Sequence, residues 1–173
     1  MPHPGQAAGE WSFSAASTGL APAAAATDVL AVGGAANKIV DVKRIEITGL
    51  TTGTGPVIDV MLHKRTVADT TGTPVALTLV PHNSRGPAAT AYINAYTANP
   101  TVGNSTGVLA VARVTLSTTA VFEDSRCVFD FTNDIAPVTL NSSAEQVCVN
   151  LNGATIAGGS LRYTVQLTER STQ

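Results

Sequence analysis

One pentapeptide has the spacing of a catalytic motif. Residues 103–107 (GNSTG) match the G-x-S-x-G pattern of serine hydrolases, in which a sharp turn between a strand and a helix exposes Ser105 beside a histidine and an acid. No helical pattern follows here, because residues 108–117 have the composition of a β-strand. A chance match in a loop rich in Gly, Ser and Thr explains the motif better, so we expect no catalytic residues and no enzyme activity. A hydrolase built around Ser105 is the least favoured of three hypotheses.

Residues that could bind a metal ion are scattered. The histidines are His3, His63 and His82, and none lies at metal-site spacing from another histidine or a cysteine. The acidic pair Glu123-Asp124 offers too few oxygen ligands for a calcium loop. We therefore expect a solvated turn at the acidic pair, an ordinary surface position for His63, and no bound metal or cofactor.

Charge and hydropathy argue against two classes of partner. The net charge is −2 and the Lys and Arg residues are scattered, which does not favour nucleic-acid binding. Two basic doublets, Lys43-Arg44 and Lys64-Arg65, have acidic residues nearby (Asp41, Glu46 and Asp59), so a surface of mixed charge is expected there. No apolar run is long enough to span a bilayer, and no basic region followed by an apolar run begins the chain. We expect no nucleic acid, no membrane segment and no signal peptide.

The two cysteines are predicted to be free thiols. Alternation places Cys127 on the apolar face of its strand and Cys148 on the polar face of another. A disulfide requires the two Cβ atoms to be close and to point toward each other. Free thiols fit a chain that folds in a reducing compartment.

Alternating apolar and polar residues predict the strands that must position these groups. Residues 145–152 and 161–169 each have one apolar and one polar face, and the Gly-rich connection between them favours a chain reversal. Residues 38–48 and 57–65 show a similar pattern. We expect both pairs to form hairpins, and the register of the second pair would set Glu46 opposite Asp59.

The apolar phase changes once within residues 38–48. A β-bulge at Lys43-Arg44 would restore the alternation, because one extra residue shifts it by one position. The residues that the bulge would bring to the core are Val40, Val42, Ile45 and Ile47.

These strands together predict the fold. Residues 108–117 (VLAVARVTLS) are apolar on both faces at their start, which is typical of a central or covered strand. Roughly eight to ten short strands separated by turn signals are typical of a sandwich or barrel. We predict an all-β antiparallel β-sandwich, jelly-roll-like, over residues 37–173, with an extended N-terminal arm over residues 1–36.

The arm and the long loop of residues 82–107 are the candidate contact surfaces. The arm is rich in small residues and buries little apolar area alone, so it should dock on a neighbouring subunit. The alternative is an edge strand and a loop of the same domain. The loop carries tyrosines, which are favoured at interfaces. The candidate interface residues are Trp11, Phe13, Leu20, Val29, Leu30, Tyr92 and Tyr96.

Several segments together resemble small virion proteins of tailed bacteriophages. They are residues 11–20 (WSFSAASTGL), the Ala/Gly/Thr-rich residues 23–36, residues 38–50 (KIVDVKRIEITGL), residues 95–101 (AYTANPT) and residues 150–169 (NLNGATIAGGSLRYTVQLTE). The resemblance implies a β-sandwich or jelly-roll subunit, often a trimer, that decorates or cements the phage head or forms part of a fibre or tail.

The resemblance and the residues together favour a structural protein of the virion. We expect a capsid decoration or cement protein, made in the host cytoplasm, that binds the outside of the phage capsid and stabilises it through inter-subunit contacts. Its partners would be further copies, in a homotrimer, and the major capsid protein or other virion proteins, with many weak contacts acting together. The alternative is a fibre or tail-tip module that binds a host-surface ligand such as a glycan.

Overall fold

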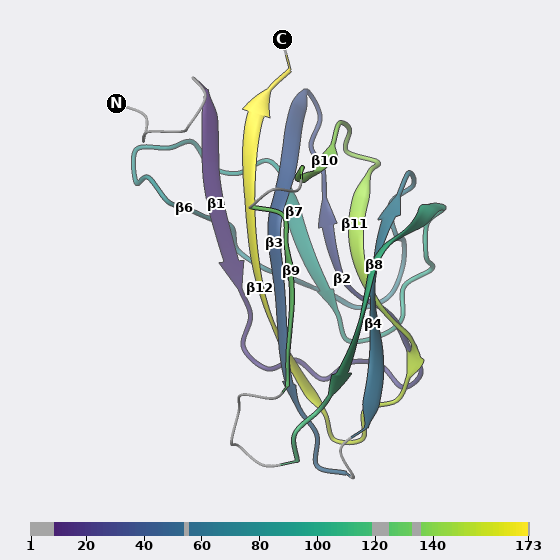
Figure 1. Cartoon of the computed structure of the whole chain (residues 1–173). Coiled ribbons are helices and arrows are strands. Elements are labelled where there is room, and N and C mark those ends of the chain that lie inside the picture. The colour runs from purple at the N-terminus through teal and green to yellow at the C-terminus, as the bar shows by residue number, and fades with distance from the viewer. Residues whose placement is uncertain (1–8, 54–55, 119–124, 133–135, 173) are drawn as a thin grey trace.

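The computed structural model describes residues 9–53, 56–118, 125–132 and 136–172. Its regular elements in these ranges are β-strands, which form two antiparallel sheets packed face to face (Figure 1). The predicted all-β antiparallel β-sandwich is therefore confirmed. Within the described ranges no helix has the length and apolar character needed to cross a membrane.

The first sheet, sheet A, is organised around the long strand β3. β3 pairs with β12 on one side and with β9 and β10 on the other, and β12 continues through β1 to the short edge strand β6. The strands of sheet A are β1 (Glu10–Ala16), β3 (Lys38–Leu50), β6 (Val80–Pro81), β9 (Arg126–Asp130), β10 (Val138–Leu140) and β12 (Ser160–Ser171).

The second sheet, sheet B, has the order β5-β7-β2-β11-β4-β8. Its strands are β2 (Ala26–Gly33), β4 (Val57–Arg65), β5 (Pro74–Ala76), β7 (Tyr92–Tyr96), β8 (Ser105–Thr115) and β11 (Gln146–Ala154). β7 lies within residues 82–107, so part of the predicted irregular loop is a strand of this sheet.

Both predicted hairpins are wrong. β3 belongs to sheet A and β4 to sheet B, and β11 and β12 are divided in the same way. Glu46 consequently lies beside Val128 and Thr164, not opposite Asp59. Two amphipathic strands can bury their apolar faces side by side in one sheet or against each other across a sandwich about 10 Å thick. Alternation is the same in both arrangements, so it could not distinguish them.

The predicted bulge in β3 is confirmed. Arg44 pairs with Gln166 and Val42 pairs with Leu167, so Lys43 is the extra residue. Its effect is to place the apolar residues on both sides of it in the core, and those buried residues are Val40, Val42, Ile45 and Ile47.

The structure corrects the prediction of an extended N-terminal arm. β1 lies between β12 and β6, and β2 lies between β7 and β11, so residues 9–36 form part of the sandwich and residues 1–8 lie outside the described residues. Phe13, Val29 and Leu30 are at most 1% exposed and are unavailable to a partner. Small residues favoured this outcome because they allow close packing: the Tyr92 ring lies over Gly33, where a Cβ would come within 2.0 Å of it. The alternative, an edge strand and a loop of the same domain, is closer to this structure. It differs in that β2 lies inside sheet B and not at its edge.

The predicted position of residues 108–117 is also wrong. Most of this segment forms β8, which is the edge strand of sheet B and pairs only with β4 among the described strands. Val108, Leu109 and Val111 are 49%, 45% and 59% exposed. The segment has the composition of a covered strand, but nothing in the described part of the chain covers it.

Candidate functional site

The remaining predicted interface residues are less accessible than expected. Tyr96 is 5% exposed and packs with Ala31 and Cys148 in a small second core on the outer side of sheet B. Trp11, Leu20 and Tyr92 are half-buried, so a contact of these three with a partner stays a prediction.

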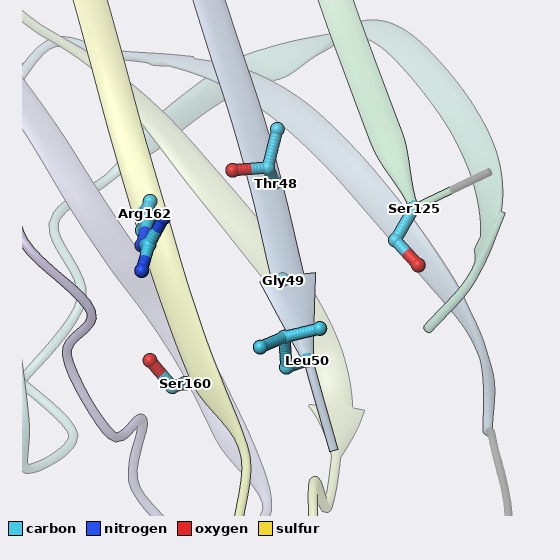
Figure 2. A pocket seen from close by; sticks show the side chains of 6 residues that line it. All are labelled: Thr48, Gly49, Leu50, Ser125, Ser160 and Arg162. Carbon is cyan, nitrogen blue, oxygen red and sulfur yellow. The ribbon is translucent and has the colours of Figure 1, made fainter. Parts of the chain in front are cut away.

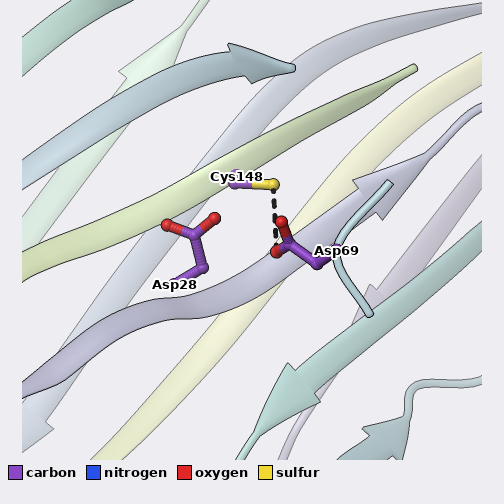
Figure 3. Close-up of side chains that lie close together, drawn as sticks. All are labelled: Asp28, Asp69 and Cys148. Carbon is purple, nitrogen blue, oxygen red and sulfur yellow. Dashed lines mark hydrogen bonds between the residues drawn. The ribbon is translucent and has the colours of Figure 1, made fainter. Parts of the chain in front are cut away.

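A buried polar cluster lies on the outer face of sheet B. It comprises Asp28 from β2, Arg65 from β4, Asp69 from the following loop, and Gln146 and Cys148 from β11. Figure 3 shows Asp28, Asp69 and Cys148 converging from their separate segments. Arg65 therefore does not lie on the predicted surface of mixed charge, because it is only 4% exposed. Lys64 does face an opposite charge there, since its Nζ lies 3.7 Å from a Glu145 carboxylate oxygen and both side chains are partly exposed.

Two loops cover this cluster. Residues 66–73 and 97–104 are joined by backbone hydrogen bonds, in which the Thr66 N–H donates to the Asn104 carbonyl at 2.9 Å and Thr70 and Thr101 bond reciprocally. Gly103 packs so closely on residue 67 that a Cβ would lie 1.7 Å from the Val67 oxygen. Glycine is required at this position because of that close approach.

Arg65 is the centre of the cluster. Its Nε and Nη2 donate to the two carboxylate oxygens of Asp28 at 2.6 and 2.9 Å, and its Nη1 donates to the Gly103 carbonyl at 2.8 Å. The Asn150 side-chain amide also donates to Asp28. A bidentate arginine pair of this kind needs the surrounding hydrogen bonds to offset the cost of desolvation.

Asp69 is the second carboxylate beside Arg65. Its Oδ1 accepts from the Gly103 N–H at 2.9 Å and lies 3.4 Å from the Arg65 Nε, and its side chain is fully buried. Burial is the main cause that raises the pKa of Asp69 to about 6, and the neighbouring Asp28 raises it further. One guanidinium neutralises one of the two carboxylates, so the other retains its proton to a higher pH than usual.

The cysteine in this cluster is free, as predicted, and so is Cys127 in the main core. Cys148 lies on the outer side of its strand as expected, but the covering loops leave it 0% exposed. Its thiol donates to Asp69 Oδ2 and Gln146 Oε1 at 3.7 Å each. Burial raises the thiol pKa well above its usual value, which keeps it protonated and unreactive at neutral pH.

The distances between side chains in this cluster would allow it to bind a metal ion. Single ligand atoms of Asp28, Asp69 and Cys148 lie within 4.8 Å of one another. However, the positive charge between the two carboxylates is already supplied by Arg65, and a metal ion would have to displace it. The geometry favours an ion-pair cluster in which Arg65 lies between the two carboxylates.

The structure brings Ser105 and His63 together, which their sequence spacing did not predict. The His63 Nδ1 lies 3.3 Å from the Ser105 hydroxyl, and burial beside Arg65 lowers the His63 pKa. The Ser105 hydroxyl is also bonded to the backbone of Lys64 and Gly107, and the other ring nitrogen, Nε2, is buried without a hydrogen-bond partner. A catalytic triad would need an acid at that nitrogen. β8 begins at Ser105, so a strand follows the motif here, whereas a nucleophile elbow leads into a helix. Glu123-Asp124 lies outside the described residues.

Two of the hollows in the described part of the chain lie away from this cluster. One, on the outer face of sheet A beside Thr48 and Arg162, has a volume of ≈ 20 Å³ and is enough for about one water molecule (Figure 2). The other is an open groove of ≈ 480 Å³ between the segments 16–20 and 75–80. Its walls are mainly apolar and carry no charged side chain.

The exposed edge of sheet B is the main apolar surface of the described chain. Four of the eight large apolar side chains that are exposed lie on β8 or at the facing end of β4, and they are Val57, Val108, Leu109 and Val111. We call this surface the β8 flank. Val128, also exposed, lies on β9, the strand of sheet A next to β8. The charged pair on the flank, among the residues that the structure describes, is Arg113 with Asp59. The strong β pattern of residues 108–117 was visible in the sequence, but their exposure was not.

Comparison with known proteins yields no match to the chain. No protein-family model matches it, and neither a curated protein nor a solved structure does so.

Proposed function

We propose that the chain is a non-enzymatic structural protein of a bacteriophage virion that binds the outside of the capsid, as a decoration or cement protein, through the β8 flank. It is made in the host cytoplasm, associates with further copies as a homotrimer, and contacts the major capsid protein. The single observation that carries this proposal is the contrast in β8 between composition and exposure. A strand apolar on both faces lies uncovered at a sheet edge.

Edge strands present unpaired backbone donors and acceptors, and proteins usually protect them with charges, prolines or short length. β8 has 11 residues and no proline, and its one charged residue, Arg113, is engaged by Asp59 at 2.9 Å. Pairing of a partner strand with β8 would supply main-chain hydrogen bonds and cover the valines of the β8 flank. Repeated over many subunits, such a contact stabilises a shell even when each one is weak.

The alternative, a fibre or tail-tip module that binds a glycan, has less support. Sugar binding commonly uses an accessible aromatic ring beside polar groups. Tyr96 is buried, the Tyr92 ring lies over Gly33 with its hydroxyl accepting from Gln146, and Trp11 packs on Gly86. Among the described residues, these aromatic side chains are directed toward the chain itself.

Particle binding tests the proposal. Purified virions or capsid-like particles should contain the chain at a fixed ratio to the shell protein, measured by quantitative mass spectrometry. The variant with Val108→Lys and Val111→Lys should lose attachment by at least about tenfold, since two charges would enter a contact that buries apolar area.

The matched control makes the same kind of substitution, Val→Lys at two positions, elsewhere on the protein surface. Val67→Lys with Val80→Lys adds the same charges at side chains that are 47% and 58% exposed outside the β8 flank. This control should attach like the unmodified chain. Absence of the chain from particles, or equal attachment of both lysine variants, would overturn the proposal.

A further inference from the structure

We propose that the capsid protein occupies the β8 flank by adding one β-strand to the open edge of β8, at Val111 and Arg113. The added strand carries an apolar and an acidic side chain two positions apart, the first beside Val111 and the second beside Arg113. This inference rests on the proposed function, because it names the form in which the partner binds the same surface.

One hydrogen bond at the end of β8 sets the direction of the backbone groups along it. The Leu116 N–H donates to the Pro56 carbonyl at 3.1 Å, so this residue faces β4. Successive residues of an antiparallel strand alternate between bonding to one neighbour and to the other. The pairing with β4 runs through residues 110–115 without a register shift. The even-numbered residues of this range therefore face β4, whereas Val111 and Arg113 direct their N–H and C=O groups to the open edge.

Other contacts limit this edge at both ends. The Ser125 hydroxyl accepts from the Ser117 N–H at 2.6 Å and donates to the Thr115 carbonyl at 3.1 Å, so it already uses the groups that an added strand would need there. At the other end Leu109 is the extra residue of a β-bulge, which disrupts the ladder locally. The stretch left between these two limits is residues 110–114, which is short and suits a single added strand.

The outward-facing side chains of this stretch define what the added strand must carry. Val111 is 59% exposed, and an apolar side chain opposite it would cover it. The Arg113 side chain is 74% exposed, and Asp59 accepts from its Nε at 2.9 Å. The other donors of the guanidinium fork suit a carboxylate, and a basic side chain opposite Arg113 would be repelled. These two positions therefore select an apolar and an acidic residue.

Val111→Pro tests the added strand. Proline removes the N–H that faces the open edge and leaves the N–H groups that face β4, which is the position where edge strands tolerate proline. Val111→Ala is the matched control, because it keeps the N–H and has the smaller apolar side chain. Attachment to purified particles should weaken at least about tenfold more for Val111→Pro than for Val111→Ala, because main-chain hydrogen bonds hold an added strand. A contact through side chains alone would not give this order.

Thermal unfolding of the isolated chain checks that the proline acts at the open edge. Val111→Pro should keep the unfolding midpoint of Val111→Ala, whereas Ala112→Pro removes an N–H that faces β4 and should lower the midpoint. If Val111→Pro is destabilised as strongly as Ala112→Pro, amide exchange of the unmodified chain decides. The amides of Val111 and Arg113 should gain at least about tenfold protection on attachment to particles, and unchanged protection would overturn the added strand.

Arg113→Gln tests the acidic residue of the partner. Attachment should weaken about two- to fivefold at low salt, and the difference from the unmodified chain should shrink as salt is added. Arg162→Gln removes an exposed arginine of sheet A and should attach like the unmodified chain. Equal attachment of Arg113→Gln and Arg162→Gln at low salt would overturn the acidic residue.

These outcomes distinguish the inference from the proposed function. Attachment that Val111→Pro and Val111→Ala weaken equally, with both variants folded, overturns the added strand and leaves the proposed function in place. Absence of attachment by the unmodified chain overturns the proposed function, and the capsid protein as partner with it. Attachment that is lost in Val111→Pro and kept in Val111→Ala supports both.

Discussion

Two arginine–carboxylate clusters lie on the outer faces of the two sheets, and they differ in what covers them. On sheet A, Glu46 accepts from Arg126 and from Arg44, and these side chains remain 21–50% exposed. On sheet B, Arg65 and Asp28 are at most 5% exposed beneath two loops. The same residue types therefore form an ordinary surface network in one place and a buried cluster in the other.

The two clusters should respond to pH in opposite directions. The hydrogen bond from Arg126 is the largest cause that lowers the pKa of Glu46, so this cluster contributes stability above the usual glutamate pKa and loses it as pH falls. Burial raises the pKa of Asp69 to about 6, so the unfolded chain gives up this proton at lower pH than the folded chain. Stability from that group therefore declines as pH rises from about 4 to about 6. The direction in which stability changes with pH therefore depends on whether loops cover the carboxylate, not on which residue types form the cluster.

The largest expected effect is loss of the buried arginine. Arg65→Met should lower the free energy of unfolding by about 3–5 kcal/mol, because it leaves Asp28 buried without a counter-charge. Urea denaturation at pH 7 measures it. The double variant Arg65→Met with Asp28→Asn should recover part of the loss, and no recovery would show that the charge of Asp28 is not the cause.

A smaller effect is expected from the second carboxylate. Between pH 4.5 and pH 7.5 the free energy of unfolding of Asp69→Asn should rise relative to that of the unmodified chain by about 1–2 kcal/mol, with allowance for solvent screening. The comparison uses urea denaturation of both chains at each pH, so titration of all other groups cancels. A constant difference between the two chains across this range would contradict the role assigned to Asp69.

The smallest effect should come from the exposed cluster. Glu46→Gln should lower the free energy of unfolding by about 0.2–1 kcal/mol at low salt, since exposed ion pairs contribute little. The loss should shrink further at 1 M salt, where the Debye length is about 3 Å. A loss as large as that of Arg65→Met would remove the contrast between the two faces.

The environment of β8 likewise depends on which segments lie over it and not on its composition. β11 and β8 both carry apolar residues, yet β11 lies between β2 and β4 whereas β8 has a neighbour on one side only. Composition alone favoured a covered position for residues 108–117. The chain instead leaves this strand at the edge, and the proposed partner completes what the composition indicates.

The sequence by itself determined the strands and the phase of their faces. Alternation located most strands, and the change of parity around Lys43 correctly placed a bulge. It also placed Cys127 in the core and indicated two free thiols. These properties depend on the period of a strand, which neighbouring residues define locally.

Only the tertiary structure decided which strands share a sheet, that residues 9–36 belong to the sandwich, and which outer-face residues are covered. Asp28 and Asp69 lie 41 positions apart, and neither showed a motif; only an isolated aspartate within the apolar segment of residues 26–33 could have drawn attention. Their chemistry arises because two loops exclude water from a face that alternation marks as polar. Exclusion of water depends on contacts between distant segments, and local pattern carries no information about them.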